Sequence, residues 1–169
     1  MTPEQIKLVQ TTFESVKPIA PQAAELFYDR LFEIAPDVRA LFPADLTEQK
    51  RKLMSMIAIA VDNLHQVEQI VPAVQGLGRR HATYGVRAAH YQSVGDALIW
   101  TLRKGLGAVF TDGVKEAWIG AYSTLAAVMS EGAANAEPSA ESRGVPDTCW
   151  AGGIDSLVSG PGFCTRGLG

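Results

Sequence analysis

Three side chains of the sequence carry groups that could bind or polarise a ligand: His81, Tyr28 and Gln49. A neutral imidazole nitrogen is a common metal ligand, and a tyrosine hydroxyl and a glutamine amide both donate hydrogen bonds. His81 follows Leu77 by four residues and so extends the apolar stripe of its segment. That pattern alone favours a half-buried histidine bonded to a backbone carbonyl. Tyr28 on an apolar stripe is, in the same way, typical of a packed core.

The other histidines are weaker ligand candidates. His65 ends a segment flanked by polar residues, and His90 falls in the first turn of the next helical pattern. The two cysteines, Cys149 and Cys164, both lie near the end of the sequence. This position argues against a disulfide framework and favours a cytoplasmic location.

The composition limits the class of protein. A length of 169 residues suits one domain, and 47% hydrophobic residues are typical of a globular chain. The net charge of -3 and the lack of a long Lys/Arg block argue against a nucleic-acid partner. We expect no secretory signal, because the first ten residues lack a basic region before an apolar core. We also expect no membrane span, because the longest weakly polar run, residues 53–61, is too short for one.

The elements that must position these side chains are predicted to be helices. Thr2-Pro3-Glu4-Gln5 is a capping box at the start of the first helix. Prolines at positions 18 and 21 separate the first helix from the second, and residues 36–43 predict a short helical turn between prolines. Asp45 is expected to cap the helix that follows. No β-strand pattern and no internal repeat is found in the sequence.

The second half of the sequence predicts longer helices. Gly85 is placed to end the segment that carries His81, and helices are expected over residues 88–106 and 112–130. The helical domain is therefore assigned to residues 1–132. Because the composition then turns to Gly, Ser, Pro and Ala without periodic apolar residues, residues 133–169 are predicted to be a disordered tail.

An ordered set of residues resembles the bacterial globins. The set comprises Tyr28 in AAELFYDRLFEIAPDVRALF, then Phe42, Gln49 and Leu53, and His81 in LGRRHATYGV. The likeness is to single-domain bacterial hemoglobins, both neuroglobin-like and related to the globin domain of flavohemoglobins. It extends to His90-Tyr91 with Val94-Gly95, and to the Ala-Trp and Ala-Tyr pairs at 117–118 and 121–122. The resemblance implies an all-α globin fold, a 3-on-3 helical sandwich around haem.

The resemblance also implies a cofactor and roles for individual residues. Haem b (iron protoporphyrin IX) would be held by His81 as the proximal iron ligand, with Tyr28 and Gln49 donating hydrogen bonds to the distal gas ligand. Residues expected to line the haem or hold its propionates are Phe42, Lys52, Leu53, Ile57, Leu77, Arg79, Arg80, Val86, Tyr91 and Val94. For the three cations among them, the alternative is a solvated helix face.

A proximal network is expected to be incomplete. In flavohemoglobin-type globins the resemblance implies a histidine–tyrosine–glutamate network that makes the iron ligand more basic. Tyr91, ten residues after His81, matches the tyrosine. Ala133 stands where the glutamate is expected, and Glu131 comes two residues early on a different helical face. We therefore expect a backbone acceptor for His81.

Three functions are compatible with this pattern. The favoured one is reversible oxygen binding, as carrier, store or scavenger, by a monomer or weak homodimer that is not an enzyme on its own. The first alternative is nitric oxide dioxygenation, with O2, NO and CO as the small ligands. It would need a separate flavin reductase, because no G-x-G-x-x-G motif follows a strand. The second alternative is a haem-based gas sensor, for which the tail is a poor output domain.

Overall fold

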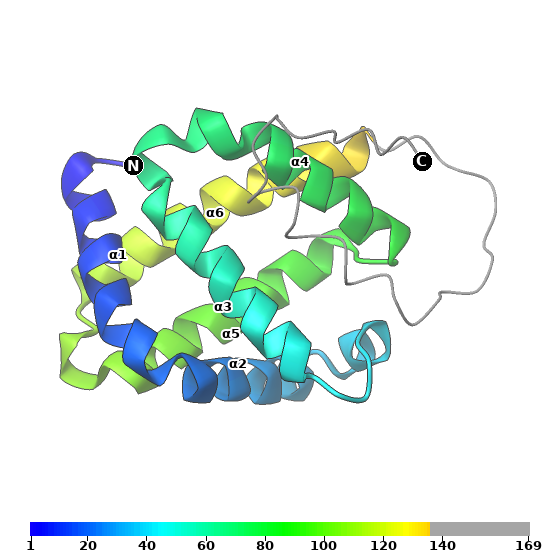
Figure 1. The fold of residues 1–169 in the computed structure, drawn as a ribbon, viewed down its shortest axis with the longest axis horizontal. Helices are drawn as coiled ribbons and strands as arrows, with labels where there is room; N and C mark the ends of the chain where they lie inside the picture. The colour runs from blue at the N-terminus through cyan, green and yellow to red at the C-terminus, as the bar shows by residue number, and fades with distance from the viewer. Residues whose placement is uncertain (136–169) are drawn as a thin grey trace, which may run out of the picture.

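The computed structural model describes residues 1–135, which form six α-helices and four short 3-10 turns (Figure 1). The α-helices are α1 (Pro3–Val16), α2 (Ala20–Ile34), α3 (Thr47–Asp62), α4 (Val67–Thr83), α5 (Ala88–Leu106) and α6 (Asp112–Ala134). The 3-10 turns are η1 (Lys17–Ile19), η2 (Pro36–Leu41), η3 (Leu64–Gln66) and η4 (Gly107–Val109). The described part of the chain contains no strand, as predicted. Apart from residues 133–135, the predicted disordered tail lies outside the described residues.

Local sequence signals set most helix boundaries. The Thr2 hydroxyl accepts the Gln5 backbone N–H at 3.2 Å, and the Gln5 side chain accepts the Thr2 backbone N–H at 3.0 Å, so the capping box is confirmed. The prediction for Asp45 was wrong by one position, because Leu46 is the residue that precedes α3. The Asp45 carboxylate instead accepts the Thr47 backbone N–H at 2.9 Å and the Thr47 hydroxyl at 2.7 Å.

Gly85 ends the helix that carries His81, as predicted. Its φ of +83° is in the left-handed region that glycine adopts without a steric penalty. The Gly85 N–H donates to the Ala82 carbonyl, and the Val86 N–H donates to the His81 carbonyl at 3.0 Å. These are the two hydrogen bonds of a Schellman motif. The expected bounds of α5 are confirmed, whereas α6 continues four residues beyond the predicted end at Ser130.

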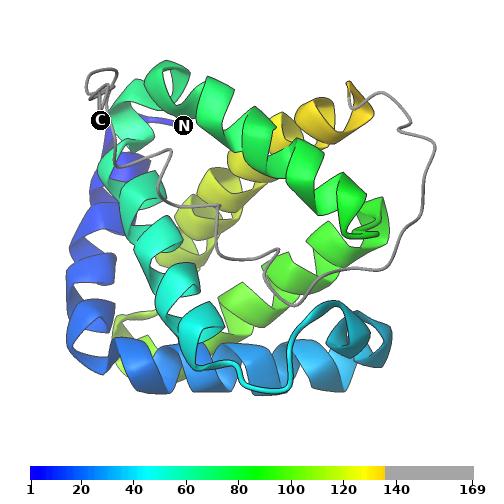
Figure 2. The same ribbon diagram turned by 45° about the vertical axis from the view of Figure 1, so that its right-hand side comes forward.

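The helices pack as two layers of three. One layer consists of α1, α3 and α4, and the other of α2, α5 and α6 (Figures 1 and 2). The core includes Phe13 and Trp118, whose ring centroids are 6.2 Å apart. The Trp118 indole N–H donates to the buried Thr12 hydroxyl at 3.0 Å, which ties α6 to α1.

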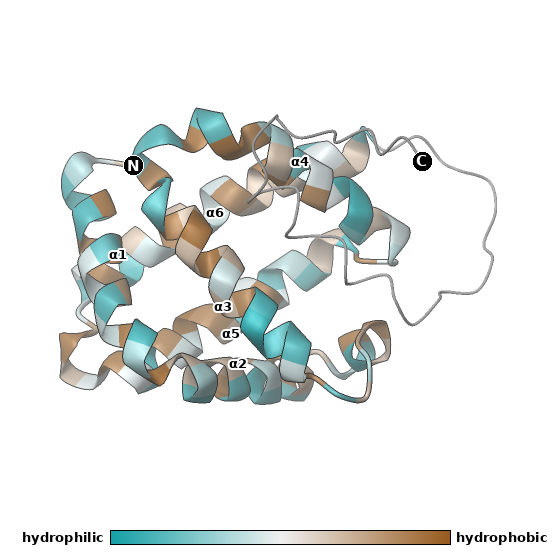
Figure 3. Ribbon diagram, viewed as in Figure 1, coloured by the Kyte–Doolittle hydropathy of each residue, from teal (hydrophilic) through white to brown (hydrophobic). Residues whose placement is uncertain are grey.

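The helices α3 and α4 diverge from their η3 connection and make few contacts with each other (Figure 2). Helix α3 is hydrophilic at its start and more hydrophobic further along (Figure 3), and the sequence after Lys52 is mostly apolar. Every residue from 52 to 60 is nevertheless only half-buried. An apolar helix face that protein covers incompletely is a surface on which a further apolar group can pack. Among the described helices, none is long and apolar enough to cross a membrane.

Candidate functional site

A cavity of about 100 Å³ lies beside His81, between α4, α5, α6 and the η2 turn. Its wall is mostly apolar and comprises Leu31, Val38, Leu41, Phe42, His81, Val86, His90, Tyr91, Val94, Tyr122 and Met129. The structure therefore brings five predicted site residues together here: His81, Phe42, Val86, Tyr91 and Val94. Because pockets for large organic ligands usually measure roughly 300–1,000 Å³, a prosthetic group at His81 would have to extend beyond this cavity.

A larger groove of about 800 Å³ runs along α5 and α6, on the other side of Tyr91 and Tyr122. Both tyrosines line the groove as well as the cavity. The groove is lined by charged and polar residues such as Arg103 and Lys115, and by none from α3 or α4. The predicted ligand-binding residues therefore point to the smaller cavity.

His81 is held by its own helix. Its Nδ1 lies 2.8 Å from the Leu77 carbonyl oxygen. A carbonyl can only accept, so Nδ1 must carry the proton and Nε2 is the nitrogen that would coordinate a metal. Burial lowers the pKa of His81, the bond to Leu77 raises it, and the nearby Arg80 charge lowers it, with burial the largest effect. The ring therefore stays neutral, as a metal ligand must. The expected backbone acceptor for His81 is confirmed.

Tyr28 and Gln49 meet at the contact of α2 and α3, and each is 4% exposed. The Tyr28 hydroxyl donates to the Gln49 backbone carbonyl at 3.3 Å, which is long for an O–H···O bond. Burial raises the pKa of Tyr28 well above its usual range. The phenol therefore remains a hydrogen-bond donor at any physiological pH, and its present bond is weak enough to be exchanged for a better acceptor.

Phe42 connects the two groups of predicted residues. It lines the cavity with His81, and its ring centroid is 5.5 Å from that of Tyr28 in an edge-on arrangement. The ring of Phe32 lies 5.6 Å from Phe42 and 5.8 Å from Tyr28. Arg39 fixes the turn after η2 by donating to the Phe42 carbonyl at 3.1 Å. Tyr28 and Gln49 do not line the cavity themselves, but the Tyr28 ring packs against Phe42, which does.

The remaining predicted residues are spread along α3 and α4. Leu53 and Ile57 are partly buried and pack against the core, and Leu77 supplies the carbonyl that holds His81. Lys52 and Arg80 are half-buried, whereas Arg79 is exposed. None of these six residues lines the cavity beside His81, so their predicted haem contacts stay predictions.

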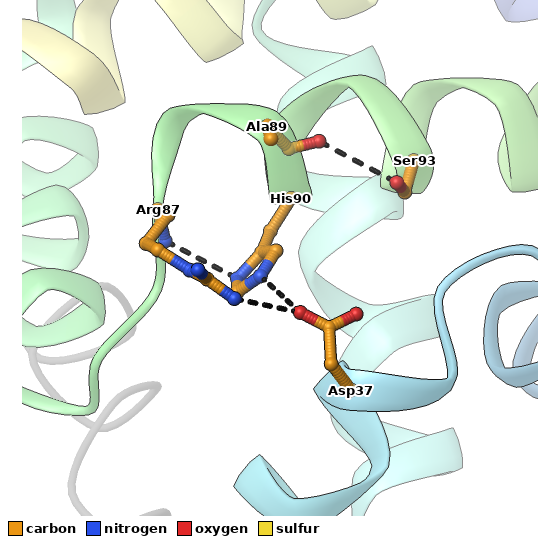
Figure 4. A network of polar contacts seen from close by, with 5 residues as sticks. All are labelled: Asp37, Arg87, Ala89, His90 and Ser93. Carbon is orange, nitrogen blue, oxygen red and sulfur yellow. Dashed lines mark hydrogen bonds and ion pairs between the residues drawn. The ribbon is translucent and has the colours of Figure 1, made fainter.

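Sequence reasoning missed a polar network at the edge of the cavity (Figure 4). The Asp37 carboxylate lies 2.7 Å from the Arg87 guanidinium and 3.1 Å from Nε2 of His90. Since Nδ1 of His90 accepts the Arg87 backbone N–H at 3.2 Å, Nε2 carries the proton and donates to Asp37. Hydrogen bonding from His90 is the main cause that lowers the pKa of Asp37, with the Arg87 charge adding to it. The network ties η2 to the start of α5, on two sides of the cavity.

The surroundings of Tyr91 bear on the expected proximal network. The buried Tyr91 hydroxyl has no hydrogen-bond partner among the described residues. Tyr122 donates its hydroxyl to the Tyr91 carbonyl, and its ring packs against Gly95. Glu131 is exposed. The Tyr91 ring centroid is 6.3 Å from that of His81, so the tyrosine lies beside the histidine, and no carboxylate within residues 1–135 bonds its hydroxyl.

The residues present fit a haem group. Fit is indicated by a neutral, half-buried histidine with Nδ1 engaged, by an apolar wall, and by an apolar face on α3 that protein covers incompletely. A buried tyrosine and glutamine lie on the neighbouring helices. A proximal histidine is one of the iron ligands that haem proteins use, and distal hydrogen-bond donors tune what binds on the other side.

Six helices in two layers around such a histidine define an all-α, haem-binding class of protein. The chain belongs to the globin family, whose model matches residues 25–129. Membership implies haem binding and small gas ligands.

Individual relatives are of two kinds. A flavohemoprotein of Vibrio cholerae is 31% identical over 134 residues, which cover 76% of this chain and 34% of the relative. This chain therefore spans about a third of that protein. A neuroglobin of Dissostichus mawsoni is 29% identical over 150 residues, covering 80% of this chain and 94% of the relative.

Solved structures share the fold. A bacterial globin from Campylobacter jejuni superposes with a TM-score of 0.71 at 24% identity, covering 79% of this chain and 96% of that one. An engineered carbene transferase from Rhodothermus marinus, described as a candidate nitric oxide dioxygenase, superposes with a TM-score of 0.72 at 25% identity. That match covers 79% of this chain and 94% of the other.

Proposed function

We propose that the protein is a haem b globin that binds oxygen reversibly, with His81 as the iron ligand and Tyr28 and Gln49 as distal donors. The observation that carries this proposal is the orientation and surroundings of the His81 ring. Its Nδ1 is fixed at the Leu77 carbonyl within an apolar cavity, next to the aromatic cluster that holds Tyr28. When bound, haem supplies an iron with one open coordination position at which O2, NO or CO can bind.

The side chains of this chain would hold the iron, exclude water and donate hydrogen bonds to the gas ligand. His81 presents a neutral imidazole of fixed orientation. Apolar residues such as Val86 and Val94 exclude water from the pocket, which strengthens every hydrogen bond formed inside it. Tyr28 releases the long bond to Gln49 and donates to the gas ligand, as the Gln49 amide can also do. A gas ligand that carries partial negative charge would gain from these donors, whereas a nearly uncharged one such as CO would gain much less.

Substitution of the histidine tests the proposal. His81→Gly should abolish or strongly alter the absorption spectrum of the ferrous, haem-reconstituted protein, because it removes the axial nitrogen. His65→Gly is the matched control, since His65 is exposed after α3 and should leave the spectrum unchanged. An unaltered spectrum for His81→Gly would exclude His81 as the ligand.

Nitric oxide dioxygenation with a separate flavin reductase is the second candidate. Its support is that relatives include a flavohemoprotein and a structure described as a candidate nitric oxide dioxygenase. Stopped-flow mixing of the oxygen-loaded protein with NO, with and without a reductase system, separates the two functions. Sustained NO consumption that depends on the reductase would favour the enzyme, and a single slow turnover would favour the oxygen carrier.

A further inference from the structure

The helices α4 and α6 touch backbone to backbone at two glycines, in the most extensive helix pairing of the described structure. A Cβ added at Gly78 would lie 1.9 Å from the Met129 carbonyl oxygen, and one at Gly132 would lie 2.2 Å from the Gln75 carbonyl oxygen. The next-nearest atoms at both positions are also backbone atoms. No side-chain rotation can relieve these overlaps, so any larger residue would have to push the helices apart.

The two contacts are reciprocal. Gln75 and Gly78 are three residues apart on α4, and Met129 and Gly132 are three residues apart on α6, so each helix brings one glycine against the backbone of the other. Positions three apart share one face of a helix. The crossing is therefore fixed at two successive turns, which restrains both the separation and the tilt of α4 relative to α6.

This crossing lies directly next to the predicted iron ligand. His81 follows Gly78 by three residues on α4, and Leu77, whose carbonyl holds the His81 ring, precedes Gly78 by one. Met129, which meets Gly78 through its backbone, also lines the cavity with His81. A change in the separation of the two helices must therefore move His81 relative to the pocket.

We propose that Gly78 and Gly132 are positioning residues that set how far the His81 side chain reaches into the haem pocket. This rests on the proposed function of His81 as the iron ligand. To move a Cβ at position 78 from 1.9 Å to 3.0 Å, below which real contacts essentially never occur, α4 must shift by about 1.1 Å. A ligand-binding constellation tolerates displacements of only about 0.5 Å. Close helix packing thus positions His81 in a chain that lacks the expected glutamate of the proximal network.

Alanine substitutions at these two glycines, and at two control glycines on the same helices, should change the Tm in opposite directions. Gly78→Ala and Gly132→Ala should lower the Tm of the haem-free protein, shift the Fe–His stretching band of the ferrous protein in resonance Raman spectra, and speed haem loss about 10- to 100-fold. In the controls Gly76→Ala and Gly120→Ala, the new Cβ meets its nearest neighbour at 3.6 Å and 3.7 Å. These controls should raise the Tm, because alanine favours a helix over glycine, and leave the band unchanged.

The outcomes are distinguishable. If Gly78→Ala does not fold, Gly132→Ala decides, since it lies two residues before the end of α6, where the helix can yield locally. A folded Gly132→Ala protein with a lower Tm but the wild-type Fe–His band and rate of haem loss would overturn the inference and leave only a structural role. Absence of the band in the wild-type protein would refute the proposed function, and this inference with it.

Discussion

Replacing Tyr28 by phenylalanine should change gas binding strongly and stability little. The ring contacts survive the change, because phenylalanine can keep the packing against Phe27, Phe32 and Phe42 at centroid distances of 5.2, 5.8 and 5.5 Å. Only the hydroxyl is lost. Its present acceptor, the Gln49 carbonyl in the first turn of α3, also has a helical N–H four residues on as a partner, so the change leaves no orphaned acceptor.

The expected magnitudes follow from these contacts. A neutral hydrogen bond contributes about 0.5–1.5 kcal/mol to stability, and one of 3.3 Å belongs at the lower end. A bond to a partly charged oxygen ligand in a dry pocket is worth about 1.5–3 kcal/mol, which corresponds to roughly 10- to 150-fold in affinity. Tyr28→Phe should therefore speed oxygen dissociation by at least about tenfold while CO dissociation changes much less.

Stopped-flow displacement of oxygen by CO measures the dissociation rate directly. Tyr122→Phe is the matched control: it removes a half-buried hydroxyl from another wall of the cavity, where the hydroxyl donates to the Tyr91 carbonyl. That control should leave oxygen dissociation unchanged. An oxygen dissociation rate for Tyr28→Phe within twofold of wild type would refute the assignment and transfer the donor role to Gln49 or to water.

Three further substitutions test other parts of the structure. Asp37→Asn should lower the Tm near neutral pH but not in acid. Folding lowers the pKa of the Asp37 carboxyl, so the stability that the carboxylate contributes is lost as the pH falls below the usual aspartate pKa of about 3.9. A Tm difference between Asp37→Asn and wild type that persists at pH 2 would contradict this. Thr12→Val should cost about 1–3 kcal/mol in urea unfolding, because it leaves the buried Trp118 indole N–H without its acceptor; the exposed control Thr11→Val should cost little, and equal effects would refute the argument. Tyr91→Phe removes a buried hydroxyl that has no partner in the described structure, so the Tm should hold or rise and the Fe–His band should stay in place; a shifted band would reveal a proximal hydrogen bond from Tyr91.

Helix boundaries were predictable because their signals are local. The Thr2–Gln5 capping box and Gly85 each act within a few residues, and both are confirmed. The end of α6 was placed too early because the composition turns to Gly, Ser, Pro and Ala at that point. In the structure Gly132 continues the helix, and its missing side chain lets α6 approach the backbone of Gln75. That reason depends on another helix and cannot be inferred from the local sequence.

In the site, too, local features were predictable from the sequence and long-range contacts were not. His81 could be placed on an inner face from its spacing to Leu77, and the structure puts both side by side with a hydrogen bond. Met129 and Tyr122 enter the cavity from α6, which requires knowing how α6 crosses α4 and α5. The contact between Asp37 and His90 spans 53 positions of the sequence, and no periodic pattern connects residues that far apart.

The acceptor at Nδ1 of His81 has a chemical consequence. A carboxylate there would make the imidazole more basic, and a neutral carbonyl such as that of Leu77 does so less. Strong electron donation from an axial ligand favours cleavage of the O–O bond, so the weaker donor favours release of the gas ligand intact. The Tyr91 hydroxyl does not alter this balance in the described structure, since it reaches no partner there. We therefore expect an Fe–His stretching frequency lower than that of globins with a complete histidine–tyrosine–glutamate network. A frequency as high as theirs would show that a group other than the Leu77 carbonyl polarises His81, and would favour the dioxygenase function.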